Sequence, residues 1–230
     1  MLVLFTGGRG SGKSTIAKAL YSKLNAIDFD YEHQWTWRMA VQTRFDKIRY
    51  YIYFLTFFNF KICGVFLSRL YRDIMNKRSK GSLSRILLPC MFSYHLDKLN
   101  RNKVGCVVYE SDFVGWSVDK ALDGVFHSGA VINYFTRTIL PRANHMTVVM
   151  CDTPVQLAVE RWNEREQKKL TEEEKAKWVA MRQDWKDARR KVIDVLCDIP
   201  NIHVLWLDSS DDPEKNAKII LDHLIGQKLS

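Results

Sequence analysis

Cysteine is scarce in this chain of 230 residues, and its spacing excludes the sites that cysteines usually build. The number of cysteines is odd, and no two of them are spaced CxxC: they are Cys63, Cys90, Cys106, Cys151 and Cys197. A disulfide scaffold and a zinc ribbon are therefore excluded, and we expect a reducing, cytoplasmic compartment. The first ten residues, MLVLFTGGRG, have no basic stretch ahead of a long apolar run, so we expect no secretory signal.

Acidic residues are scarce in one segment, from Trp35 to Lys103. It holds fourteen Lys or Arg and three Asp, a net charge of +11, whereas the whole chain carries +9. The segment also contains the aromatic run Tyr50–Phe60, which is too short for a bilayer span of ~20 apolar residues. We expect a helical insert with an aromatic core. The alternative is a peripheral surface for an anionic membrane or a lipid-linked acceptor; no recognition motif supports nucleic-acid binding.

Short apolar runs alternate with helical periodicity outside that segment. Apolar residues make up 47% of the chain, enough for a folded core. The runs predict strands at 2–6, 26–29, 104–109, 146–151 and 203–207, and helices at 13–24, 131–140, 155–167, 171–196 and 213–225. Such alternation is typical of a parallel sheet covered on both faces. We expect a three-layer α/β domain formed by residues 1–34 and 104–230, with residues 35–103 as the acceptor-side insert.

A glycine-rich motif follows the first predicted strand directly and precedes the first predicted helix. It matches G-x-x-x-x-G-K-[ST], and its residues are Gly7, Gly8, Arg9, Gly10, Ser11, Gly12, Lys13 and Ser14, followed by Thr15. Glycines let backbone N–H groups turn toward phosphate oxygens at the positive end of a helix. The motif predicts a P-loop NTPase fold that binds ATP, with Lys13 on the β- and γ-phosphates and Ser14 on Mg²⁺.

Carboxylates follow two predicted strands. Asp28 and Asp30 end the predicted strand 26–29, and Glu110, with Asp112 nearby, ends the predicted strand 104–109. Ligands of open parallel sheets bind beyond the carboxyl ends of strands. We expect Asp30 or Glu110 to orient an acceptor oxygen, and Asp28 and Glu110 to join Ser14 around Mg²⁺. An Asp-rich turn and an ordinary strand-end acid are the alternatives.

Two arginines lie four residues apart on the predicted helix 155–167. Arg161 and Arg165 share one face of that helix, and a highly charged stretch from 166 to 177 follows. Such a segment suits a lid that closes over phosphates, neutralises their charge and excludes water. A solvated helix with Glu–Arg pairs is the alternative.

These motifs together resemble the nucleoside and nucleotide kinase branch of P-loop proteins, particularly thymidylate-kinase-like chains. The resemblance covers residues 1–30 and 104–230. It implies that Gly7–Thr15 bind the ATP phosphates, that Arg161 and Arg165 are lid arginines, and that residues 208–211 lie near the adenine. The Asp28-Phe29-Asp30 stretch is instead similar to the Asp-x-Asp of shikimate and gluconate kinases, which addresses a substrate hydroxyl.

The residues after the third predicted strand depart from both kinase patterns. Thymidylate kinases carry Asp-Arg-Tyr there and deoxynucleoside kinases Glu-Arg-Ser, whereas this chain has Glu110-Ser111-Asp112. The missing arginine favours a small-molecule hydroxyl, sugar-like or nucleoside, as the acceptor. A nucleoside monophosphate is the first alternative. A nucleotide-dependent switch or ATPase that docks on a membrane or partner is the second, and a second copy of the chain is a further candidate partner.

Overall fold

The computed structural model describes residues 1–34, 96–97, 106–110, 141, 145–167 and 170–229. The predicted insert, residues 35–103, lies outside these residues except for residues 96–97. The predicted helix 131–140 and the residues Ser111 and Asp112 also lie outside them. The described part contains the phosphate-binding motif and the predicted lid.

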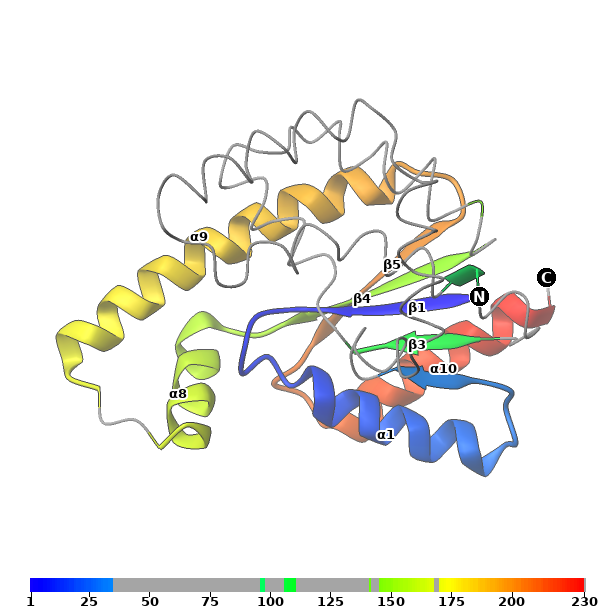
Figure 1. Ribbon diagram of the computed structural model, residues 1–230, viewed down its shortest axis with the longest axis horizontal. Helices are drawn as coiled ribbons and strands as arrows, with labels where there is room; N and C mark the ends of the chain where they lie inside the picture. Colours follow the sequence, from blue (N-terminus) through cyan, green and yellow to red (C-terminus); the bar gives the residue numbers. More distant parts are fainter. Residues whose placement is uncertain (35–95, 98–105, 111–140, 142–144, 168–169, 230) are drawn as a thin grey trace, which may run out of the picture.

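Five parallel strands form the sheet at the centre of the described structure. In chain order they are β1 (Leu2–Thr6), β2 (Glu32–Gln34), β3 (Val107–Tyr109), β4 (Met146–Asp152) and β5 (Ile202–Asp208). Their spatial order is β2-β3-β1-β4-β5, with every neighbouring pair parallel (Figure 1). All five residues of β1 are buried, because helices cover both faces of the sheet. The expected parallel α/β architecture is confirmed.

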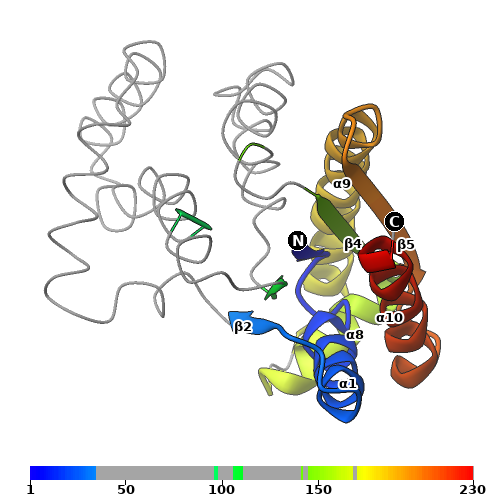
Figure 2. The same ribbon diagram turned by 90° about the vertical axis from the view of Figure 1, so that its right-hand side faces the viewer.

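Helices cover the sheet on both sides. On one face, α1 (Lys13–Ala26) packs against α10 (Pro213–Leu229), as Figure 2 shows. The long helix α9 (Glu172–Cys197) covers the other face, and α8 (Val155–Arg165) lies beyond the carboxyl ends of the strands (Figure 1). The core between the sheet and these helices contains a cluster of buried apolar residues, to which Leu20 and Leu24 of α1 and Leu224 of α10 belong. None of the helices in the described ranges is long and apolar enough to cross a membrane.

The start of α9 is fixed by its own sequence. Thr171 caps the helix: its hydroxyl accepts from the backbone N–H of Glu174 at 3.2 Å, and the Glu174 carboxylate accepts from the Thr171 N–H at 2.8 Å. Three acidic residues in the first turn stabilise the helix, because their negative charges lie at the positive end of its dipole. The helices predicted at 155–167 and 171–196 are confirmed as α8 and α9, and these two helices contact each other.

The predicted strand 26–29 is wrong. Helix α1 continues to Ala26, and the chain then turns at Asp28 in the left-handed conformation, with φ +50°. The N–H of Asp28 donates to the carbonyl of Asn25, and the N–H of Phe29 donates to that of Leu24, which is the Schellman pattern of a helix C-terminus. Leu24 and Phe29 both contact the apolar core. The apolar residues that predict a strand at 26–29 therefore belong to this helix cap.

This correction moves two predicted site residues. Strand β2 begins only at Glu32, so Asp28 and Asp30 precede it and lie at the amino edge of the sheet. The phosphate-binding motif lies at the carboxyl edge, at the other end of α1, whose 14 residues span about 21 Å. The structure therefore separates both aspartates from the site in which the sequence analysis placed them.

Candidate phosphate-binding site

The motif Gly7–Thr15, here called the phosphate loop, wraps around the space between β1 and the first turn of α1. Gly12 is the N-cap of α1 and has φ +77°, and Gly10 has φ +83°. A Cβ atom on Gly10 would lie 2.1 Å from the carbonyl oxygen of Ala158 in α8. Only glycine combines this backbone conformation with so close an approach. The loop thus forms a cradle at a helix N-terminus, and its residues fit a phosphate group.

Lys13 lies folded over the start of this loop. Its Nζ atom donates to the carbonyl oxygens of Gly7 and Gly8, the second at 2.9 Å, and to the Ser11 hydroxyl at 3.4 Å. These three acceptors are neutral and lie at the mouth of the loop. A phosphate oxygen is a stronger partner for the ammonium group, because charge-assisted hydrogen bonds are about twice as strong as neutral ones.

A cavity of about 660 Å³, here called the loop cavity, brings the predicted lid and the phosphate loop together. Arg161 and Arg165 of α8 line it with Ser14 of the loop. The Arg161 Nη1 atom donates to the carbonyl of Ser209 at 3.2 Å, and the Arg165 guanidinium pairs with Glu166 at 2.9 Å. Residues 209–213 form the remaining wall. The segment expected near the adenine therefore borders the same cavity as the loop.

Ser14 is placed where it could serve as a ligand of the predicted Mg²⁺ ion. Ser14 is the second residue of α1 and lines the loop cavity, so its hydroxyl could join the oxygens that Mg²⁺ prefers, together with phosphate and water. Among the described residues, no group of three or more His, Cys, Asp or Glu could hold a metal ion alone. The residues present fit an ion carried by a nucleotide, and Asp28 is too far away to share in holding it.

Glu110 lies at the carboxyl end of β3, as the sequence predicts, and is only 7% exposed. It faces α1, where burial and then the negative charge of Glu110 raise the pKa of Tyr21 far above its ordinary value. The Tyr21 ring also stacks on Tyr31 at a centroid distance of 5.7 Å. Glu110 lines neither the loop cavity nor the second cavity described below. Its expected roles with Mg²⁺ and the acceptor remain predictions.

A small polar network that the sequence analysis missed fixes the phosphate loop from behind. The Thr153 hydroxyl donates to the backbone carbonyl of Ser11 at 3.3 Å and also contacts the Ser209 hydroxyl. Ser209 Oγ in turn donates to the carbonyl of Asp152 at 3.2 Å. Thr153 and Ser209 are both buried. They join the phosphate loop to the turns that follow β4 and β5. In the sequence, the signal for this network was the short polar residues that directly follow these two strands.

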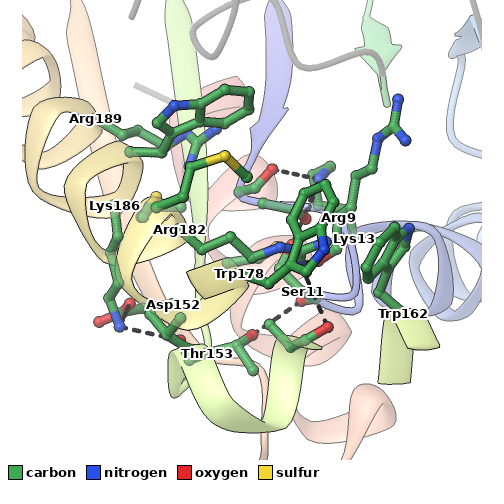
Figure 3. A pocket seen from close by; sticks show the side chains of 18 residues that line it. Arg9, Ser11, Lys13, Asp152, Thr153, Trp162, Trp178, Arg182, Lys186 and Arg189 are labelled. Carbon is green, nitrogen blue, oxygen red and sulfur yellow. Dashed lines mark hydrogen bonds and ion pairs between the residues drawn. The ribbon is translucent and has the colours of Figure 1, made fainter. Parts of the chain in front are cut away.

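A second cavity, of about 580 Å³, lies between the phosphate loop and the α8–α9 hairpin (Figure 3). We call it the tryptophan cavity, because three indoles line it. Its side chains come from α8 and from two i, i+4, i+8 rows of α9, and the main ones are Trp162, Trp178, Met181, Arg182, Trp185, Lys186 and Arg189. The sequence analysis did not single these residues out, although the spacing on α9 was visible.

The sheet order and the glycine loop between β1 and α1 define an α/β P-loop NTPase fold. No protein-family model matches the sequence, and no curated protein matches it. The structure is similar to that of deoxyadenosine kinase from M. mycoides with bound dATP, with a TM-score of 0.50 and 15% identity over 97% of this chain and 99% of that one. It is also similar to the Bacillus subtilis YorR protein in complex with phosphorylated GDP, with a TM-score of 0.53 and 12% identity over 100% of this chain and 99% of that one. At these identities the likeness shows the fold.

Proposed function

We propose that this protein is an ATP- and Mg²⁺-dependent phosphotransferase of the nucleoside kinase class. The observation that carries the proposal is the loop cavity, where Lys13 and the phosphate loop face two arginines of a helical lid. A cradle of backbone N–H groups with mobile cations above it stabilises charge as a phosphoryl group moves. The names of the two structural neighbours, a deoxyadenosine kinase and a protein bound to phosphorylated GDP, support a nucleotide ligand.

The roles of the residues follow from their positions. Lys13 exchanges the carbonyls of Gly7 and Gly8 for phosphate oxygens and neutralises their charge. Arg161 and Arg165 approach from the lid and exclude water from the same phosphates. When bound, ATP supplies the γ-phosphoryl group, and Mg²⁺, with the Ser14 hydroxyl as its protein ligand, offsets part of the charge. Thr153 keeps the loop in its phosphate-binding conformation.

The acceptor is the finer part of the proposal. The sequence favours a hydroxyl, of a nucleoside or a sugar-like molecule, because Ser111 replaces the arginine of the nucleotide-accepting pattern. Glu110 at the end of β3 is then the candidate to orient that hydroxyl. A nucleoside monophosphate is the second candidate acceptor, and the cations of the tryptophan cavity favour it. Asp30 has no part in the proposal, since it lies at the opposite edge of the sheet.

The test is ³¹P NMR of the products formed from ATP with nucleosides, nucleoside monophosphates, shikimate-like acids and sugars. A new monoester signal identifies a hydroxyl acceptor, and a new diphosphate identifies a monophosphate acceptor. Either product must form in proportion to ADP. Release of phosphate to water alone, with every acceptor, would contradict the proposal. That result would favour a nucleotide switch or ATPase, and binding to anionic liposomes would then test residues 35–103 as its docking surface.

A further inference from the structure

Two of the cations that line the tryptophan cavity, Arg9 and Arg182, have no carboxylate partner among the described residues. The described lining carries five cations, Arg9, Lys13, Arg182, Lys186 and Arg189, against one carboxylate, that of Asp152. That carboxylate is already engaged, because it pairs with Lys186 at 2.6 Å and with Arg190 at 2.7 Å. Arg9 and Arg182 lie beside the phosphate loop, next to the mouth where Lys13 lies. Such a wall attracts an anionic ligand.

Arg182 is the central cation of this wall. Its Nη1 atom donates to the backbone carbonyl of Arg9 in the phosphate loop and, at 3.5 Å, to that of Ala158 in α8. Its guanidinium lies 4.8 Å from the ring centroid of Trp162 and 6.0 Å from that of Trp178. Figure 3 shows these three side chains gathered at the loop. Among the described residues no carboxylate pairs with Arg182.

The surroundings of this guanidinium disfavour its charge. Burial lowers the pKa of Arg182, and the neighbouring charges of Arg9 and Arg165 lower it further. Arg165 is paired with Glu166, but the described structure gives the Arg9 side chain no carboxylate. The guanidiniums of Arg9 and Arg182 thus line one space beside the phosphate loop, and the described partners of Arg182 are backbone carbonyls and aromatic rings. A phosphate or another anion would supply the missing partner, in the bidentate geometry that arginine favours.

The opposite part of the wall is apolar and open. Met181 and Trp185 of α9 line the cavity and remain 36% and 40% exposed, although most large apolar side chains in the described ranges are buried. Trp178 lies one helical turn away and tilts against Trp162 at a centroid distance of 4.7 Å. Exposed indole and thioether surfaces provide a platform on which a flat aromatic ring can stack. The cavity therefore offers a ring site next to an anion site.

We propose that the tryptophan cavity binds an acceptor that carries both an aromatic ring and an anionic group, a nucleoside monophosphate, and that Arg182 binds the anion. Arg182 leaves the Arg9 carbonyl as the phosphate arrives, while Trp178 and Trp185 cover the base. That this ligand is the acceptor rests on the proposed phosphotransfer, whereas the binding site itself does not depend on it. Since α9 carries both the ring platform and Arg182, filling the cavity also draws the lid helix onto the phosphate loop.

The experiment compares matched pairs of ligands in the absence of ATP. Deoxyadenosine, deoxyguanosine, deoxycytidine and thymidine are titrated against their 5′-monophosphates, with tryptophan fluorescence as the readout. We expect at least one monophosphate to quench the fluorescence and to bind about tenfold or more tightly than its nucleoside. Arg182→Met should remove that preference, Arg182→Lys should retain part of it, and Lys191→Met, on the exposed side of α9, should leave it unchanged. Equal binding of all pairs, or an Arg182→Met variant with an intact preference, would overturn the proposal.

Two further measurements separate this inference from the proposed function and from the donor. Binding of ADP to Arg182→Met should match the unmodified protein; if ADP binding falls instead of monophosphate binding, Arg182 belongs to the loop cavity and the proposal is wrong. Trp178→Leu should weaken the binding of both the nucleoside and the monophosphate in each pair, and Trp178→Phe should restore that binding. Since these titrations need no turnover, an inactive protein that binds monophosphates through Arg182 would refute the phosphotransfer and leave the site in place.

Discussion

The Nζ atom of Lys186, in the middle of α9, lies 2.6 Å from a carboxylate oxygen of Asp152 at the end of β4. The same lysine donates to the backbone carbonyl of Thr153 at 3.0 Å, and Arg190, one turn further on, reaches the second oxygen of Asp152 at 2.7 Å. One carboxylate thus anchors α9 to the turn after β4, where the next residue, Thr153, donates to the phosphate loop. The stability of α9 and the shape of the loop are therefore linked through Asp152.

Replacing Asp152 by Asn should loosen this anchor. Two cations lose their counter-charge in a half-buried setting, so we expect the free energy of unfolding to fall by about 1–3 kcal/mol. Urea denaturation measures the change, and Asp184→Asn, on the exposed side of α9, is the matched control, with an effect within about 0.5 kcal/mol. An Asp152→Asn protein as stable as its control would mean that the two ion pairs do not anchor the helix.

The glycine loop between β1 and α1, the helices α8 and α9 and most strand positions could be predicted because their signals are local. The glycine motif, the Arg161–Arg165 spacing and the capping residues at Thr171 each act within one turn of chain. The apolar runs at β1 and β4 were read correctly, because a strand covered on both faces has no polar alternation to confuse it. These elements needed no knowledge of the rest of the molecule.

The errors and omissions arose where tertiary packing decides. Ile27-Asp28-Phe29-Asp30 alternates like a strand, yet Phe29 packs against Leu24 and closes a helix instead. The tryptophan cavity was missed because the orientation of α9 depends on its anchor at Asp152, far away in the sequence. A row of Trp and Arg on a helix can face solvent, a core or a ligand, and only the fold decides which.

Replacing Lys13 by Ala should abolish phosphoryl transfer while the fold stays intact. The lysine lies at the mouth of the loop and outside the apolar core, so we expect the fold to survive, whereas a positioned donor of this kind is worth about 10²–10³ in kcat. Product formation followed by ³¹P NMR, with a thermal melt as the test of folding, gives both answers. Lys18→Ala, on the exposed side of α1, is the control. Retained transfer in a folded Lys13→Ala protein would refute the assignment of the site.

Replacing Gly10 by Ala should distort the phosphate loop. The new Cβ atom would lie 2.1 Å from the Ala158 carbonyl at a backbone conformation that alanine avoids, so α8 or the loop must move. We expect a loss of more than about 1 kcal/mol of stability and a weaker affinity for ADP. Gly226→Ala is the control, because that glycine lies inside α10 with nothing within 4 Å; we expect it to stabilise the protein by about 0.5–1 kcal/mol. Similar effects at the two positions would contradict this account.

Replacing Thr153 by Val should leave buried oxygens without a donor. The hydroxyl serves the carbonyl of Ser11 and contacts Ser209, and valine keeps its shape but not its hydrogen bonds. We expect a cost of about 1–3 kcal/mol in urea denaturation and a lower affinity for ADP. Thr153→Ser keeps the hydroxyl and should recover most of the affinity. If serine performs no better than valine, packing of the methyl group and not the hydrogen bond holds the loop.

A pair of histidines away from the site should make stability fall in mild acid. His223 of α10 meets His203 of β5 edge-on at a centroid distance of 5.4 Å, and burial first, then the charge of His203, lower the pKa of His223 below its ordinary value of 6.5. The unfolded chain therefore binds a proton near pH 6.5 that the folded protein refuses. Stability is complete above pH 6.5 and is lost as the pH falls from there toward the folded pKa. Urea midpoints at pH 7.5, 6.5 and 5.5 measure this loss, which His223→Leu should reduce and His203→Gln should reduce only in part; an equal loss in His223→Leu would show that other groups cause it.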